Sequence, residues 1–165
     1  MALIKLAGTV NDSIVDGEGY RFTIFAQGCP HNCIGCQNPQ THDFSGGYAE
    51  DTDKLLETIL KNPLLSGATF SGGEPFCQPK PLAELARKLH QHNLDVWCYT
   101  GYTMEQLLNG TPEQVELLGE LDVLVDGPYE EWKRDISLSF RGSSNQRVID
   151  VQKSLKQNKV VLYEL

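Results

Sequence analysis

Strand-like and helix-like segments alternate along this chain, and the alternation restricts its fold more than any other feature. β-Branched and aromatic runs predict strands, and recurring Leu, Ile and Ala predict helices between them. The strand-like runs are 2–10, 20–26, 68–70, 94–99 and 121–125, with two further candidates at 148–151 and 160–163. The helix-like segments are 52–60, 80–92 and two short ones that begin after Thr103 and Thr111. This order is typical of an α/β chain with a largely parallel sheet.

The length of the chain limits which α/β architecture it can form. A closed eight-unit barrel takes about 250 residues, or about 31 for each strand–helix unit. The 165 residues therefore have room for about five units. We expect a single domain over residues 1–165, with five to six strands and three to four helices. If it is a (β/α) barrel, the barrel is incomplete and open on one side.

Three cysteines lie within eight residues, just after the second predicted strand. Cys29, Cys33 and Cys36 have the spacing C-x3-C-x2-C in a long loop at 28–47. Thiolates are soft ligands that select zinc, copper or iron–sulfur clusters. A [4Fe–4S] cluster normally takes four cysteines. Three local cysteines without an obvious fourth favour a cluster with one iron left open for a small molecule.

Two other uses of these thiols remain open from the spacing alone. A structural zinc ion takes four ligands, and no second C-x2-C pair supplies the fourth. The candidates for a fourth ligand are His31, His42, Cys77 and Cys98. A redox dithiol at Cys33 and Cys36 is the other alternative, but it leaves Cys29 unexplained.

A second motif, Gly72-Gly73-Glu74, follows the predicted strand at 68–70. Ligands collect at the carboxyl ends of strands in open α/β sheets and barrels. The two glycines let a ligand approach the backbone closely, and the Glu74 carboxylate offers a partner for an ammonium group. A buried carboxylate also needs a cationic partner. A plain turn is the alternative interpretation of the motif.

Together these motifs resemble the radical S-adenosylmethionine (SAM) superfamily and, within it, the activating proteins of anaerobic (class III) ribonucleoside-triphosphate reductases. The resemblance covers about residues 11–147. The segments that carry it are GCPHNC at 28–33, CQNP at 36–39, FSGGEP at 70–75, YTGY at 99–102 and VDGPY at 125–129. The implied fold is an open partial (β/α) barrel of the radical SAM type.

The resemblance also implies a chemistry. Cys29, Cys33 and Cys36 would hold three irons of a [4Fe–4S] cluster, and the amino and carboxylate groups of SAM would chelate the fourth iron. Gly72, Gly73 and Glu74 would contact the SAM ammonium. Reductive cleavage of SAM would give a 5′-deoxyadenosyl radical, which would generate a glycyl radical on the reductase.

The resemblance is less specific for four further residues. The superfamily usually has an aromatic residue before the third cysteine, where this chain has Gly35. The backbone from Gly35 to Gln37 is then expected to meet the adenine. Thr100 would touch the SAM ribose or begin a turn. Asp126 would take a polar role at the barrel mouth or simply form an Asp-Gly-Pro turn.

The implied partners are the reductase and an electron donor such as reduced flavodoxin. Arg141 and Arg147 are candidates to pair with the SAM carboxylate or the reductase, or are ordinary surface residues.

Two other functions remain open from the sequence. The first is a radical SAM enzyme that acts on another glycyl-radical enzyme or on a small molecule. The second is a zinc-stabilised binding module without enzymatic activity.

Charge and hydropathy argue against two classes of partner. The formal net charge is −8, and a negative surface repels nucleic-acid phosphates. No run approaches the roughly 20 apolar residues that span a bilayer, and the amino-terminal segment lacks the features of a signal peptide. Clustered thiols without a secretory signal favour a reducing, cytoplasmic location.

Overall fold

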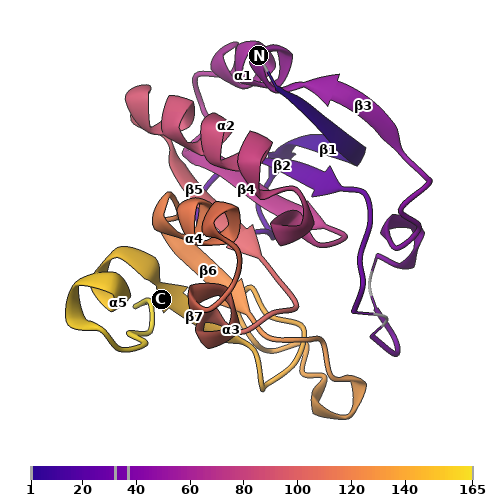
Figure 1. The fold of residues 1–165 in the computed structure, drawn as a ribbon, viewed down its shortest axis with the longest axis vertical. Coiled ribbons are helices and arrows are strands. Elements are labelled where there is room, and N and C mark those ends of the chain that lie inside the picture. The colour runs from indigo at the N-terminus through magenta and orange to yellow at the C-terminus, as the bar shows by residue number, and fades with distance from the viewer. Residues whose placement is uncertain (1, 32, 37, 165) are drawn as a thin grey trace.

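The fold is taken from a computed structural model that describes residues 2–31, 33–36 and 38–164. The described residues form seven strands in one sheet (Figure 1). The strands are β1 Leu3–Ser13, β2 Arg21–Ala26, β3 Tyr48–Asp51, β4 Gly67–Gly72, β5 Asp95–Tyr99, β6 Val123–Asp126 and β7 Arg147–Asp150.

The sheet has a parallel centre and antiparallel edges. Its order is β3-β1-β2-β4-β5-β6-β7. The strands β2, β4, β5 and β6 run parallel to one another. β1 pairs antiparallel with β2 and β3, and β7 pairs antiparallel with β6. In the described chain, β3 and β7 are the two edge strands and do not pair with each other. The barrel is therefore open, as expected for a chain of this length.

Five α-helices and three short 3-10 turns connect the strands of the described chain. The helices are α1 Thr52–Leu60, α2 Pro79–Gln91, α3 Met104–Leu108, α4 Pro112–Gly119 and α5 Val151–Gln157. The 3-10 turns are η1 Pro39–Thr41, η2 Pro75–Cys77 and η3 Glu131–Lys133. Both predicted capping boxes form, at Thr103 and Thr111. Figure 1 shows α1, α2 and α4 side by side on the same side of the sheet, where α2 contacts both neighbours.

The two faces of the sheet have different roles, and β5 illustrates them. Val96 and Cys98 are buried in the main core with the leucines of α2. Trp97 and Tyr99 point to the opposite face, where Trp97 packs edge-on against Phe140. Since successive side chains of a strand alternate between faces, one face of β5 packs against helices while the other faces the interior of the open barrel.

The structure differs from the sequence-based expectations at both edges of the sheet. β3 is a four-residue edge strand without buried side chains, so it lacks the apolar pattern that marks a strand. α5 is seven residues long, too short to show a clear helical period. The prediction of a strand at 160–163 is wrong, because this segment forms only a single isolated bridge, between Leu162 and Ile149.

Arg21 lies on the inner face, near the amino ends of the parallel strands, and its side chain is fully buried. Its Nε donates to Thr69 Oγ1 over 2.7 Å, and one terminal nitrogen donates to the Ala68 carbonyl over 2.8 Å. The same terminal nitrogen lies 2.6 Å from Asp95 Oδ1. The guanidinium therefore joins β2, β4 and β5 at the end of the barrel opposite their carboxyl ends.

We expect Arg21→Met to destabilise the protein by about 3 kcal/mol, because removal of one member of a buried ion pair leaves its partners unsatisfied. Such a removal typically costs about 3–5 kcal/mol. We expect the lower end of this range because the Asp95 side chain is half-exposed. Urea unfolding of the cluster-free protein measures the change. The control is Arg87→Ala, which breaks an exposed ion pair with Glu116 and should cost less than about 1 kcal/mol. Equal losses in the two variants would contradict this role of Arg21.

In the part of the chain that the structure describes, no helix has the length and apolar character needed to cross a membrane.

Candidate functional site

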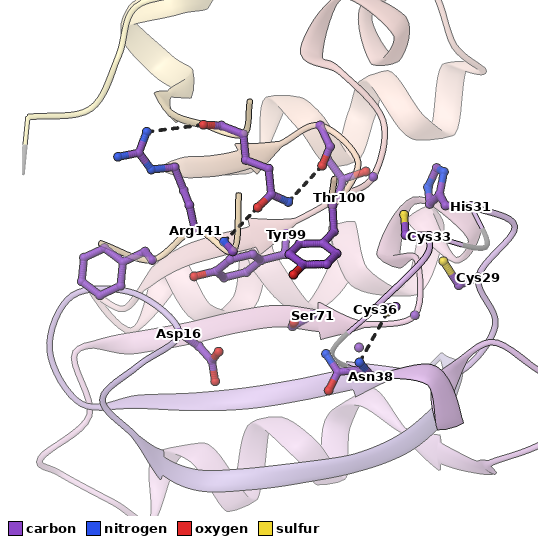
Figure 2. Close-up of a pocket in the computed structure, with 18 of the residues that line it drawn as sticks. Asp16, Cys29, His31, Cys33, Cys36, Asn38, Ser71, Tyr99, Thr100 and Arg141 are labelled. Carbon is purple, nitrogen blue, oxygen red and sulfur yellow. Dashed lines mark hydrogen bonds between the residues drawn. The ribbon is translucent and has the colours of Figure 1, made fainter. Parts of the chain in front are cut away.

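A cavity of about 340 Å³ lies at the carboxyl ends of β4 and β5. Its walls come from five segments, within residues 15–16, 29–42, 71–73, 99–101 and 127–146. Figure 2 shows Cys29 and Cys33 at one end of the cavity, and Asp16 and Arg141 toward the other. The cysteine motif and the glycine motif, about 40 residues apart in sequence, therefore share one cavity.

The cysteine loop, defined as residues 28–47, folds back on itself beside β2. Gly28 turns the chain with a φ of +104°. The N–H groups of Gly28 and Cys29 then donate to the carbonyls of Thr41 and His42, over 2.6 and 3.2 Å. A 3.3 Å backbone hydrogen bond closes a turn between the second and third cysteines. These bonds hold the three cysteines along one wall of the cavity.

All three thiols are partly buried and electrostatically coupled. Burial is the largest cause that raises the pKa of Cys29, and negative charge on Glu74, Cys33 and Cys36 raises it further. Burial also raises the pKa of Cys33, and charge on Cys36 adds to the effect. Three thiolates at this position would repel one another in the absence of a cation.

The donor set therefore fits a metal cluster. Bound metal ions are strong positive charges that reverse such shifts and deprotonate the thiols that coordinate them. Among the described residues, no group of three or more His, Cys, Asp or Glu side chains is found that could hold a metal ion. In a [4Fe–4S] cluster each thiolate binds a different iron, so three cysteines on one wall suit that group.

Cys36 also receives hydrogen bonds from the loop itself. The Asn38 N–H donates to its sulfur over 3.4 Å, and His42 Nε2 lies 3.2 Å from the same atom. N–H donors to a ligating sulfur are among the groups that tune the potential of an iron–sulfur cluster. This contact places the His42 ring on the sulfur of the third cysteine.

The remaining two cysteines lie outside the cavity. Cys98 is fully buried in β5, within the main core, where cysteine packs as a small apolar side chain. Cys77 is an exposed residue at η2, but neighbouring atoms shield its thiol from part of the solvent. This desolvation, together with the charge of Glu74, raises the pKa of the Cys77 thiol to about 11. Neither residue lines the cavity with the three clustered thiols.

Gly72 and Gly73 line the cavity and also carry the sheet pairing into the cysteine loop. The Gly73 N–H donates to the Ala26 carbonyl, and the Glu74 N–H donates to the Gly28 carbonyl, both over 2.7 Å. Gly72 has a φ of +95°, a conformation that favours glycine. The glycines therefore serve close backbone packing in addition to any contact with a ligand.

Glu74 lies behind the cavity wall and is not part of the lining. Its side chain is fully buried. Its two oxygens lie 2.9 and 2.8 Å from the Thr100 hydroxyl, whose single proton is shared between them. Thr100 does line the cavity, but its hydroxyl is directed to Glu74. The described partners of the carboxylate thus come from the protein itself.

Gly35 has a φ of +75°, and a Cβ at this position would come within 2.7 Å of the Glu131 carboxyl carbon. The positive φ is the stronger reason for glycine here, because side chains rarely adopt this backbone conformation, whereas the Glu131 side chain is flexible. Gly35 is not among the residues that line the cavity. Gln37, the other residue expected to meet the adenine, lies outside the described residues.

Asp126 is placed away from the cysteine cavity, in a salt bridge at the β6–β7 edge. Its carboxylate accepts from the Met104 N–H over 2.8 Å, which anchors the start of α3. Arg147 Nε donates to it over 3.0 Å, and Arg147 also contacts Glu105. The pair of Asp126 and Arg147 thus joins β6, β7 and the start of α3. Arg141 lines the cavity, and donates to the Gln146 carbonyl over 3.4 Å.

The sequence-based reasoning missed several lining residues, notably Asp16 and Tyr99. The Asp16 carboxylate accepts from the Ser13 and Thr23 hydroxyls, over 2.9 and 3.2 Å. Tyr99 is partly buried, and desolvation of its hydroxyl, together with the nearby charge of Asp16, raises its pKa above the usual range. Tyr99 was detectable as the last residue of a strand, the position where functional side chains collect. Asp16 carried no such signal.

Comparisons with known proteins agree with this geometry. Residues 15–149 match the family model described as a 4Fe-4S single cluster domain. The anaerobic ribonucleoside-triphosphate reductase-activating protein of Pasteurella multocida is 39% identical over 142 residues, which cover 81% of this chain and 89% of the relative. The protein of the same name from Vibrio cholerae is 35% identical with the same coverage.

A solved structure supports the fold independently of close sequence similarity. QueE from Escherichia coli superposes with a TM-score of 0.51 at 14% identity, over 75% of this chain and 70% of that one. The two sequence relatives are 39% and 35% identical, and the residues matched by the family model, 15–149, include the cysteine and glycine motifs. This chain belongs to the family of anaerobic ribonucleoside-triphosphate reductase-activating proteins and has its 4Fe-4S single cluster domain.

Proposed function

We propose that the protein activates an anaerobic ribonucleoside-triphosphate reductase by generating a glycyl radical on it. A [4Fe–4S] cluster and SAM would supply the chemistry: one-electron cleavage of the sulfonium, followed by hydrogen abstraction from a glycine Cα of the reductase. The observation that carries the proposal is the shared cavity, where Cys29, Cys33 and Cys36 lie beside the Ser71–Gly73 backbone.

The residues of this chain would bind and orient the cofactors. Cys29, Cys33 and Cys36 would ligate three irons. The Asn38 N–H donates to the third sulfur, and His42 Nε2 lies 3.2 Å from the same atom. The backbone of Gly72 and Gly73 would lie against the methionyl part of SAM. Glu74 would hold this wall from behind. Asp126 has its partners elsewhere, so we assign it to packing of the β6–β7 edge.

The proposal extends to the setting of the reaction. Thiolate ligands must be kept reduced, a condition that the cytoplasm maintains. We therefore propose a cytoplasmic location and an electron donor such as reduced flavodoxin. We also propose that the whole chain is one radical SAM domain, because one continuous sheet runs from β3 to β7.

The test is anaerobic incubation of the reconstituted protein with SAM, a reductant and the purified reductase. We expect a glycyl-radical doublet in the electron paramagnetic resonance (EPR) spectrum of the reductase and release of methionine. A reductase whose target glycine is replaced by alanine is the control, and it should give no doublet. Methionine release without any doublet on the reductase, but with a doublet on another glycyl-radical enzyme, would contradict the proposed substrate.

A further inference from the structure

The carboxylate of Glu74 is buried within a set of donors drawn from several elements. Oε1 accepts from the Gly101 N–H over 2.8 Å and lies 2.6 Å from His31 Nε2. Oε2 accepts from the Phe76 N–H over 3.0 Å, and the Thr100 hydroxyl reaches both oxygens. Since an ionised carboxylate only accepts hydrogen bonds, His31 Nε2 is the donor in its contact.

The His31 ring is held in this position from two sides. Its side chain is only 15% exposed. The ring packs edge-on against Tyr102, with a centroid distance of 4.5 Å. It also lies against Gly101, where a Cβ would come within 2.6 Å of Nε2. The absence of a side chain at Gly101 therefore makes room for the imidazole.

His31 is the described partner that the cysteine loop gives to this buried carboxylate. The other donors to the carboxylate are the Thr100 hydroxyl and the N–H groups of Phe76 and Gly101, which lie in the segments after β4 and β5. A buried carboxylate that loses a hydrogen-bond partner is left less well satisfied, so the contact with His31 helps to hold the loop against these segments.

The contact also joins the two motifs of the site. His31 lies between the first two cysteines, and Glu74 follows the glycine pair at the end of β4. We infer that His31 is a positioning residue: through Glu74 it fixes the cysteine loop relative to the carboxyl ends of β4 and β5. It thereby couples the placement of the cluster ligands to the wall against which SAM is proposed to bind. The second part of this inference rests on the proposed function.

The first test needs no cofactor and uses the cluster-free protein. A double-mutant cycle of His31→Ala and Glu74→Gln, read by urea unfolding, measures the coupling between the two side chains. We expect a coupling of about tenfold in the unfolding equilibrium constant, as for residues in direct contact. The control pairs His92→Ala, an exposed histidine, with Glu74→Gln and should give additive effects. Additive effects of His31→Ala and Glu74→Gln would overturn the inference.

The second test examines the reconstituted protein. His31→Ala should retain the iron content of the wild type, because the three cysteines and the backbone hydrogen bonds at the base of the loop, from Gly28 to Thr41 and from Glu74 to Gly28, all remain. It should bind SAM at least about tenfold more weakly, the effect of about 1.4 kcal/mol, and lose the SAM-induced change in the EPR spectrum of the reduced cluster. His31→Gln should partly restore both, because its amide can donate to Glu74. Wild-type SAM affinity and an unchanged EPR response in His31→Ala would overturn the coupling.

A third variant displaces the ring without removing it. Gly101→Ala should reproduce the SAM-binding defect of His31→Ala, because the added methyl group occupies the space of the imidazole. Gly119→Ala is the matched control, since a Cβ there meets no atom within 4 Å. Normal SAM affinity in Gly101→Ala would contradict the inferred position of the ring. If wild-type protein itself binds no SAM, the proposed function fails, while the double-mutant cycle still tests the contact.

Discussion

Replacement of Cys29, Cys33 or Cys36 by alanine will abolish SAM cleavage and prevent stable assembly of the cluster. The reason is that each thiolate is expected to hold a different iron, so no remaining side chain replaces the lost bond. The iron and acid-labile sulfide content after anaerobic reconstitution measures assembly, and methionine release measures cleavage. Wild-type protein should contain about four irons per chain.

The other two cysteines provide matched controls for this experiment. Cys77→Ala and Cys98→Ala should retain the iron content and most of the activity, because neither residue lines the cavity. Cys98→Ala should also lower the free energy of unfolding slightly, since it removes a buried sulfur from the core. Full activity in Cys36→Ala, or loss of the cluster in Cys77→Ala, would contradict the assignment of the ligands.

Gly73→Ala is expected to have the second largest effect, although it changes no proposed ligand of iron. A Cβ at Gly73 would lie 2.8 Å from the Gly28 carbonyl carbon and 2.9 Å from the Thr41 oxygen. Both are backbone atoms at the base of the cysteine loop, so the loop must move to relieve the contact. Overpacking of this kind costs about 1–3 kcal/mol, and the displaced loop should no longer assemble the cluster efficiently.

Urea unfolding of the cluster-free protein and the iron content after reconstitution together test this prediction. Gly8→Ala is the control, because a Cβ at Gly8 in β1 meets nothing within 4 Å. If Gly73→Ala has normal stability and iron content but weak SAM affinity, the glycine serves ligand access alone. Such a result would contradict the packing role that the backbone hydrogen bonds indicate.

The elements that were predictable are those with strong local signals. α2 has a long apolar stripe, and Thr103 and Thr111 form the capping boxes that their sequences indicate. The cysteine loop was predictable because a strand precedes it and its ligand spacing is local. In each case, a few neighbouring residues carry the full signal.

The features that were missed depend on pairing between distant segments. β3 exists because its backbone pairs with β1, not because of its own side chains. The sequence predicted a cationic partner for Glu74, but it did not indicate that the His31 ring would lie 2.6 Å from its carboxylate, because the two residues are 43 positions apart. Asp126 was a candidate for the site because it lies at the end of a predicted strand, and its salt bridge to Arg147 could not be predicted because the two residues are 21 positions apart.

Electron–nuclear double resonance on the reduced, reconstituted protein tests the central claim most directly. The samples would contain SAM labelled with ¹⁵N at its amino group or with ¹⁷O at its carboxylate. Hyperfine coupling from both labels is the expected result, because three thiolates would leave one iron free to bind both groups. Absence of both couplings, together with coupling to a nitrogen of a protein histidine at that iron, would contradict it.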